Sequence, residues 1–270
     1  MISLIISVYK RLDFLDLILQ SIEKQSFRDF EVIVAEDNND PATTENVARA
    51  RLLYKFNILH RSQEDTGFRK TRILNDAVRS ASGEKLVFID GDCVLHRHFL
   101  KAYNESITEN NFCYGRRVYC SEKHTNMLLA SRSIEKCTIR SAVLLGGKST
   151  GAGFYFPVKL KRSKQSRRIL GCNWGIMKKN ILAVNGFDED YTRAGVGEDF
   201  DIDWRLKNQG LRINSMKGRA IVFHLHHKLN YSPSDTEHVE KLMAEKKEAG
   251  ETFCRNGIIK TVGSRKTVIQ

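Results

Sequence analysis

The sequence predicts an α/β fold with a doubly wound, mostly parallel sheet flanked by helices, followed by a C-terminal helical tail. In the first 120 residues, short apolar runs alternate with stretches in which apolar residues recur at helical spacing. The predicted strands cover 2–8, 30–35, 57–59 and 85–89, and the predicted helices cover 12–22, 45–54 and 69–81. This order is typical of a parallel sheet that binds ligands at the carboxyl ends of its strands. Two acidic motifs, Glu36-Asp37 and Asp90-Gly91-Asp92, follow such strands, so we expect them to face one crevice.

The second half of the chain has a weaker pattern. From 120 to 168, Gly146-Gly147-Lys148-Ser149 and the basic stretch 159–168 predict long surface loops. Order returns with an apolar stretch at 169–177, helices at 179–185 and 198–208, a strand at 220–223 and a polar helix at 234–249. A basic tail follows that helix.

The composition limits the classes of partner. The 270 residues are 41% hydrophobic, enough for a substantial core, and 44 Lys+Arg against 32 Asp+Glu give a net charge of +12. This charge favours anionic partners, namely nucleic acid, acidic lipid or a phosphorylated glycan. Because no nucleic-acid-binding motif is present and aromatic residues do not interleave with the basic run, we expect no nucleic-acid partner.

Cysteine usage and the apolar runs bear on the compartment. The six cysteines are scattered without a C-x-x-C pair, which indicates reduced thiols and neither disulfides nor a zinc site. No basic residue precedes the first apolar run, and no run approaches the length that spans a bilayer. We therefore expect a cytoplasmic protein, either free or in peripheral contact with the inner face of the cell membrane.

Asp90-Gly91-Asp92 places two carboxylates, one residue apart, at the end of a predicted buried strand. Carboxylates this close repel each other unless they are solvated or bridged by a cation. A divalent metal that also holds a diphosphate removes the conflict, and oxygen ligands suit Mn²⁺ or Mg²⁺. The alternative is a polar turn in which an Asp caps a helix over 96–109.

Gly197-Glu198-Asp199-x-Asp201 is a second acidic cluster. A sugar hydroxyl is a poor nucleophile at neutral pH, so a transferase needs a carboxylate that takes its proton. Asp199 is our candidate for that base, and Glu198 for orienting the acceptor. The alternative is a helix N-terminus with acidic first-turn residues, which is how we interpret Asp201.

His224-Leu225-His226-His227 follows the strand predicted at 220–223. Imidazole beside carboxylates favours Mn²⁺ over Mg²⁺, so one of these histidines is a candidate metal ligand. Strand alternation predicts that His224 and His226 point to the same side. The alternative for each is a structural or surface role.

Three more segments suit a nucleotide. Ser7-Val8-Tyr9 and Glu36-Asp37-Asn38 end the first two strands, where an aromatic ring and a carboxylate can hold a base and a ribose. The stretch 63–70 contains Asp65 and Phe68 and places Arg69 and Lys70 at a helix start, where anions are favoured. Ordinary turns and a solvated basic helix are the alternatives.

These motifs in this order resemble the family 2 glycosyltransferases of GT-A fold, from Ile2 to about His227. The resemblance rests on five motifs: Ile5-Ile6-Ser7-Val8-Tyr9, Glu36-Asp37, Gln63-x-Asp65-x-Gly67-Phe68-Arg69, Asp90-x-Asp92, and Asn185-Gly186-Phe187-Asp188 leading to Gly197-Glu198-Asp199. It implies a metal-dependent hexosyltransferase that uses a UDP-sugar donor and inverts the sugar's configuration. The implied metal is Mn²⁺ (or Mg²⁺) on Asp92 and on His224 or His226. The implied base is Asp199, and the implied nucleoside pocket contains Val8, Tyr9, Asp37 and Asp65. Together with Ser7, Glu36, Phe68, Arg69, Asp90 and Gly91, these are our candidate donor-binding residues.

The second half looks like the galactosyltransferase-type region of bacterial capsule, chondroitin-type and lipopolysaccharide enzymes. The resemblance implies a hexose or N-acetylhexosamine donor and an envelope polysaccharide, lipopolysaccharide or glycolipid acceptor. Many relatives carry a tryptophan just before Gly-Glu-Asp, where this chain has Ala194-Gly195-Val196-Gly197. Trp174, with Asn173 beside it, is our candidate acceptor platform instead.

The resemblance also predicts which parts of the chain bind the donor, bind the acceptor and carry catalysis. We expect residues 1–120 to bind the nucleotide-sugar, 121–232 to bind the acceptor and carry catalysis, and 233–270 to form a C-terminal helix and basic tail. The basic stretch 159–168 is a candidate for a phosphorylated acceptor or the anionic leaflet, and a solvated loop is the alternative. A catalytically inactive GT-A binding protein and a basic nucleic-acid-binding protein are the competing functions.

Overall fold

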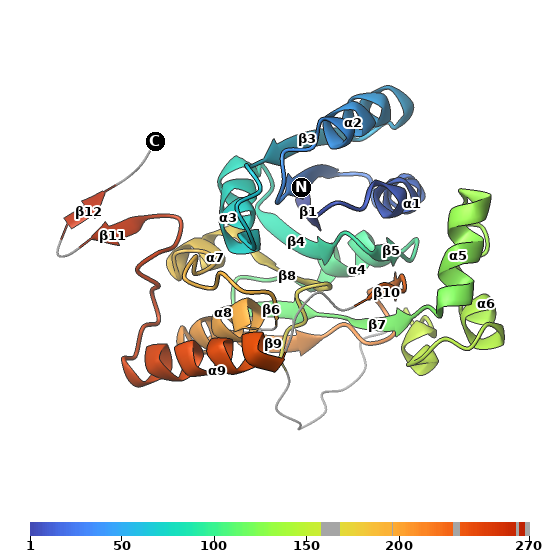
Figure 1. The fold of residues 1–270 in the computed structure, drawn as a ribbon. Helices are drawn as coiled ribbons and strands as arrows, with labels where there is room; N and C mark the ends of the chain where they lie inside the picture. Colours follow the sequence, from blue (N-terminus) through green and yellow to red (C-terminus); the bar gives the residue numbers. More distant parts are fainter. Residues whose placement is uncertain (158–167, 196, 229–232, 263–264, 268–270) are drawn as a thin grey trace.

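A seven-stranded sheet runs through the middle of the molecule in the computed structural model (Figure 1), which describes residues 1–157, 168–195, 197–228, 233–262 and 265–267. Its order is β3-β2-β1-β4-β8-β6-β9. The strands are β1 (Ile2–Val8), β2 (Phe30–Glu36), β3 (Asn57–Ser62), β4 (Lys85–Asp90), β6 (Asn111–Tyr114), β8 (Trp174–Met177) and β9 (Arg212–Ser215). Only β8 runs antiparallel to its neighbours, so the predicted α/β class with a mostly parallel sheet is confirmed.

Helices cover both faces of this sheet because the side chains of β1 alternate between them. Leu4 and Ile6 pack on one face with α1 (Leu12–Glu23), α2 (Pro41–Leu53) and α4 (Phe99–Ser106). Ile5 packs on the other face with α3 (Lys70–Ser80), α7 (Lys178–Ala183) and α8 (Gly197–Asn208). Two apolar cores result, one on each side of the sheet.

The predicted elements of the first half are confirmed with shifted ends. Helix α2 begins at Pro41, four residues earlier than expected, because the Asp40 side chain accepts a hydrogen bond from the Ala42 N–H and Pro41 fits the first helical turn. The helix expected over 96–109 is shorter, at Phe99–Ser106, since residues Cys93–Leu95 form strand β5 instead.

The stretch from 120 to 157 contains more order than the loops we expected. Helices α5 (Glu122–Ser131) and α6 (Ile139–Leu144) and a 3-10 turn η1 (Thr150–Gly153) lie here. The Ser121 hydroxyl accepts a hydrogen bond from the His124 N–H and so caps α5. The basic stretch 159–168 lies outside the described residues except for Arg168.

A second, three-stranded sheet has the order β5-β10-β7, where β7 is Arg116–Tyr119 and β10 is Ile221–His224. It joins segments that are far apart in the chain, since β10 pairs antiparallel with β5 and parallel with β7. Helix α9 (Pro233–Glu248) lies beside α8, and the hairpin of β11 (Lys260–Val262) and β12 (Arg265–Thr267) lies far from α5 and α6 (Figure 1).

Two further observations concern the cysteines and the helices. All six cysteines are free thiols, as the sequence predicted. Within the ranges that the structure describes, no helix combines the length and the apolar character needed to cross a membrane.

Candidate active site at the carboxyl edge of the sheet

A cleft of about 730 Å³ opens where β1, β2 and β4 end. The ends of parallel strands meet at one edge of a sheet, which is why residues from three strands line it. Gly91 allows this convergence, because a Cβ at that position would lie 2.8 Å from the Ser7 carbonyl oxygen. The expected crevice therefore exists, and Asp37 and Asp90 both line it.

Asp92, which lines this cleft together with His227, contacts two histidines. Its Oδ2 lies 3.3 Å from Nε2 of His224 and 2.9 Å from Nε2 of His227. One ligand atom from each residue lies within 4.8 Å of the others, which is the spacing of a metal-binding group. The antiparallel pairing of β5 with β10 brings them together, since it sets His224 opposite Cys93.

The protonation states of this cluster follow from its contacts. Burial raises the pKa of Asp92, but the hydrogen bond from His227 and the charge of His224 outweigh it and lower the pKa to about 2. An ionised carboxylate with two imidazoles fits Mn²⁺, and fits Mg²⁺ less well because Mg²⁺ prefers oxygen ligands.

The expected ligand His226 does not reach this cluster. Strand β10 ends at His224, so the alternation that predicted His226 beside His224 stops there. The Leu225 N–H donates to the Asp92 carbonyl, and the His226 N–H donates to the Thr125 hydroxyl, which leaves the His226 side chain exposed. His227 takes the place that we expected for His226.

Lys70 is a site residue that the sequence motifs indicated only as one of two cations at a helix start. Its Nζ donates to Oδ1 of Asp90 at 2.9 Å and lies 3.5 Å from Oε1 of Glu198. Burial lowers the pKa of Lys70, but the carboxylates of Asp90, Glu198 and Asp199 outweigh it and hold the pKa well above its usual value. The signal was the pair of cations at the start of α3, which we interpreted only as a general anion site.

Glu198 and Asp199 lie in the first turn of α8. Glu198 lines the cleft, whereas Asp199 is not among the lining residues and accepts a hydrogen bond from the Gly171 N–H at 2.7 Å. Burial, followed by the charge of Asp199, raises the pKa of Glu198 to about 8. Burial also raises the pKa of Asp199, to about 6, with Lys70 opposing the shift.

Asp201 has a structural role, and it is buried against Arg205 rather than exposed at the start of the helix. Its Oδ2 accepts a hydrogen bond from Nε of Arg205 at 2.8 Å, and both side chains are buried. Arg205 also donates to the carbonyls of Val184 and Gly186. The pair therefore ties α8 to the turn that follows α7.

The residues expected around a nucleoside divide into two groups. Ser7, Tyr9, Asp37 and Phe68 line the cleft. Asp65 lies at its rim, where it accepts hydrogen bonds from the Tyr9 hydroxyl at 3.3 Å and pairs with the Lys10 ammonium at 2.7 Å.

The other three expected residues do not line the cleft. Val8 is buried in the core, because it alternates with Ser7 and Tyr9 along β1. Glu36 is buried and binds the Asp40 N–H and Nε2 of His60. Arg69 points its guanidinium at the Glu64 carbonyl, while its backbone N–H donates to Oδ2 of Asp37 and so orients that carboxylate.

The expectation that Trp174 and Asn173 bind an acceptor is wrong. Trp174 is 1% exposed and stacks on Phe88 at 4.5 Å between ring centroids. Asn173 is fully buried, where it accepts a hydrogen bond from the Tyr103 hydroxyl and donates to the carbonyls of Arg116 and Ala220. Because strand β8 lies in the middle of the sheet, both side chains are core residues.

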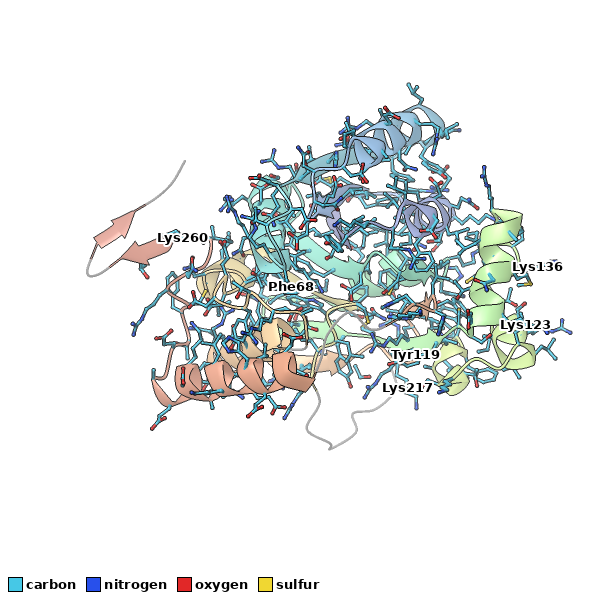
Figure 2. All side chains as sticks on the ribbon, in the orientation of Figure 1. Phe68, Tyr119, Lys123, Lys136, Lys217 and Lys260 are labelled. Atoms are coloured by element: carbon cyan, nitrogen blue, oxygen red, sulfur yellow. The ribbon has the colours of Figure 1, made fainter. Side chains whose placement is uncertain are left out.

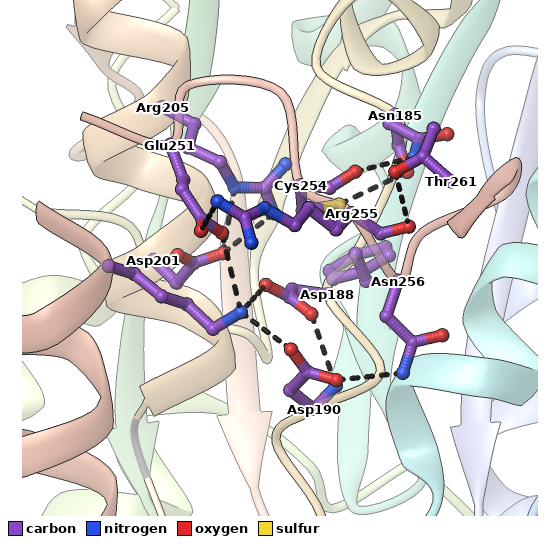
Figure 3. A network of polar contacts seen from close by, with 12 residues as sticks. Asn185, Asp188, Asp190, Asp201, Arg205, Glu251, Cys254, Arg255, Asn256 and Thr261 are labelled. Carbon is purple, nitrogen blue, oxygen red and sulfur yellow. Dashed lines mark hydrogen bonds and ion pairs between the residues drawn. The ribbon is translucent and has the colours of Figure 1, made fainter. Parts of the chain in front are cut away.

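A network of buried charges holds α9 against the active-site half (Figure 3). The Lys246 ammonium lies 2.7 Å from Oδ2 of Asp188 and 2.6 Å from Oδ2 of Asp190. Helix α9 also packs on the first residue of α8, since a Cβ on Gly197 would clash with Val239. These contacts fix the position of the turn that carries Glu198.

The sheet order and the cleft at its edge are those of the GT-A fold, which the solved structures described below share. The chain belongs to glycosyl transferase family 2, whose profile matches residues 3–182. A profile described as the N-terminal domain of galactosyltransferase matches residues 156–228. The family resemblance that the sequence motifs indicated is thereby confirmed.

Individual relatives are distant. An uncharacterised glycosyltransferase of Rickettsia conorii is 21% identical over 208 residues, which is 72% of this chain and 33% of that protein. The chain therefore spans about a third of the length of the curated relatives it matches. Among solved structures, S. aureus TarS with UDP has a TM-score of 0.61 at 18% identity and covers 91% of this chain and 64% of that one. The Pyrobaculum calidifontis mannosyltransferase PcManGT, with GDP-Man and Mn²⁺, has a TM-score of 0.56 at 17% identity, covering 93% and 62%.

Proposed function

We propose that this chain transfers a hexose or N-acetylhexosamine from a UDP-sugar to a glycan hydroxyl with inversion of configuration. The observation that carries the proposal is that one cleft is lined by Asp92 and His227 of the candidate metal cluster and by the Lys70, Asp90 and Glu198 group, with His224 behind them in contact with Asp92. The family adds support, and so do the UDP bound to TarS and the GDP-Man and Mn²⁺ bound to PcManGT.

The donor's place in the cleft follows from charge and shape. Ser7, Tyr9, Asp37 and Phe68 offer an aromatic and polar lining for the nucleoside. The diphosphate belongs near Lys70 and the Asp92 cluster, where Asp92, His224 and His227 would hold Mn²⁺. A bound Mn²⁺ would neutralise the charge that develops on the departing diphosphate.

In the proposed reaction, Asp199 takes the proton of the acceptor hydroxyl as its oxygen attacks the anomeric carbon. The new glycosidic bond forms while the bond from that carbon to the diphosphate oxygen breaks, and UDP leaves with the electron pair. A pKa of about 6 keeps Asp199 mostly ionised at neutral pH and still basic enough to help. Glu198 and Lys70 position the donor beside Asp199. Attack from the face opposite the diphosphate inverts the configuration of the anomeric carbon.

We also propose an acceptor, the place where it is used and a division of roles along the chain. The acceptor is an envelope polysaccharide, lipopolysaccharide or glycolipid, used in the cytoplasm or at the inner face of the membrane. Residues 1–120 carry most of the donor-binding side chains, 121–232 carry the proposed base and much of the acceptor side, and 233–270 form the C-terminal helix and basic tail. The part of the basic stretch 159–168 that we expected to meet acceptor or membrane lies outside the described residues.

UDP release from a panel of UDP-sugars, with Mn²⁺ and with EDTA, tests the proposal. We expect turnover with at least one UDP-hexose or UDP-N-acetylhexosamine in Mn²⁺, and none in EDTA. Binding of UDP without turnover of any donor would indicate an inactive binding protein. Turnover that is indifferent to EDTA would contradict the metal site.

A further inference from the structure

A second hollow, of about 500 Å³, lies beside the catalytic residues, and nothing in the proposed reaction so far uses it. We call it the basic groove, and it is lined by Arg116, Arg117, Tyr119, Ser149, Leu170 and Lys217, among others. Figure 2 labels Tyr119 and Lys217 close together and Phe68 of the main cleft apart from them. The groove and the main cleft share no lining residue, so they are separate hollows.

The three cations of the groove have no carboxylate partner within the part of the chain that the structure describes. Arg116 and Lys217 are exposed, and Arg116 lies over the Tyr114 ring. Arg117 donates from Nε to the Tyr119 hydroxyl at 2.8 Å and from Nη1 to Sγ of Cys172 at 3.4 Å. Three positive charges around one hollow favour an oxyanion, and an arginine guanidinium can bind phosphate or carboxylate through two parallel hydrogen bonds.

The groove is adjacent to the proposed base. Leu170 lines it, and the next residue, Gly171, donates the hydrogen bond that holds Asp199. On the other side, the Tyr119 ring lies 5.4 Å from the His224 ring, centroid to centroid. A molecule in the groove would therefore lie one residue along the chain from the backbone N–H that holds Asp199.

We propose that the basic groove binds the acceptor, and that this acceptor is an anionic glycan carrying a phosphate or carboxylate group. The proposal rests on the proposed transferase function, because that function makes Asp199 the base. The arginines and Lys217 recognise the anionic group, and Tyr119 gives a sugar ring an apolar face with a polar edge. The donor diphosphate does not need this groove, since Lys70 already serves the main cleft.

Binding of three oligosaccharides of equal length tests the assignment. They are a phosphodiester-linked oligosaccharide, an oligogalacturonate and a neutral maltooligosaccharide, titrated calorimetrically into the chain with Mn²⁺ and UDP. We expect at least one anionic oligomer to bind about tenfold more tightly than the neutral one, and its affinity to fall as salt rises. Which anionic oligomer binds distinguishes phosphate from carboxylate.

A matched pair of double variants locates the binding. Arg116→Glu with Lys217→Glu removes two groove cations, and we expect it to weaken anionic binding by about tenfold or more. Arg49→Glu with Lys55→Glu makes the same charge change on exposed residues at the β3 edge of the large sheet, and we expect affinity within about twofold of the wild type. All four side chains are exposed, so thermal unfolding checks that both variants fold.

Two outcomes overturn the groove proposal: equal affinity for neutral and anionic oligomers, or equal losses in the two double variants. UDP binding with Mn²⁺ is titrated separately on each protein. Its absence in the wild type contradicts the donor assignment, whereas intact UDP binding with no oligomer discrimination contradicts the groove alone.

Discussion

The ammonium of Lys70 lies 2.9 Å from Oδ1 of Asp90, so a lysine from the start of α3 neutralises the first carboxylate of the Asp90-Gly91-Asp92 motif. Asp92 instead turns to His224 and His227. The two acids of one short motif therefore have different partners. Asp90 belongs with Lys70 and Glu198, and Asp92 belongs with the two histidines of the candidate metal site.

Lys70→Met should impair both stability and transfer. It leaves the half-buried Asp90 and the buried Glu198 without their counter-charge, which we expect to lower the free energy of unfolding by about 2 kcal/mol and kcat/KM by at least about tenfold. Urea unfolding and UDP release measure the two effects. Lys70→Arg, which keeps the charge, should retain most of the stability. Equal loss in both variants would show that the charge is not what matters.

His227→Ala and His226→Ala form a direct test of the metal cluster. We expect His227→Ala to weaken Mn²⁺ binding by at least about tenfold, because it removes one of three ligands, and His226→Ala to leave it unchanged. Electron paramagnetic resonance of free Mn²⁺ in titrations measures both. A larger loss in His226→Ala would reverse the assignment.

The pH profile of kcat/KM should report Asp199. A general base works only when deprotonated, so activity should rise with pH through about 6 and then level off. Asp199→Asn should lose about 10²-fold to 10⁴-fold of the activity together with this acidic limb. The profile is taken at two saturating Mn²⁺ concentrations, which separates the base from protonation of the metal ligands. An unchanged limb in the residual activity of Asp199→Asn would assign the inflection to another group.

Lys246→Met should weaken the attachment of α9 to the segment that carries Asp188 and Asp190. The substitution leaves Asp188 unpaired in a buried position, and we expect a loss of about 3 kcal/mol in unfolding free energy. Lys241→Met, an exposed position on the same helix, is the control and should change stability by less than about 0.5 kcal/mol. Equal effects in urea unfolding would mean that the network in Figure 3 does not hold the helix.

Trp174→Phe separates a core residue from a sugar platform. We expect it to cost about 1–2 kcal/mol of unfolding free energy, because a smaller ring leaves a gap beside Phe88 and Phe187. The KM for the acceptor should stay within about twofold of the wild type, since a buried side chain touches no ligand. A rise in that KM without loss of stability would restore the acceptor role.

Local pattern was enough to predict the first half of the fold and the position of the cleft. The apolar runs that became β1, β2 and β4 are continuous because those strands are buried on both faces, and parallel strands place their ends at one edge. For Glu36 and Val8 the local pattern did not predict which way the side chain points. Each lies at the correct strand end, but the side on which its side chain falls depends on the register and on buried partners such as His60.

The sequence by itself determined the fold class, the family motifs and the acidic residues at the sheet edge, because each is a local property of a strand, a helix start or a turn. Only the tertiary structure decided that His227 rather than His226 joins Asp92, that Lys70 pairs with Asp90, and that Trp174 lies in the core. Those outcomes depend on pairings between segments far apart in the chain, such as β5 with β10 and α3 with α8. The chemistry of the side chains determines which residues can interact. Which of these possible contacts form depends on distances that are set only when the sheets have assembled.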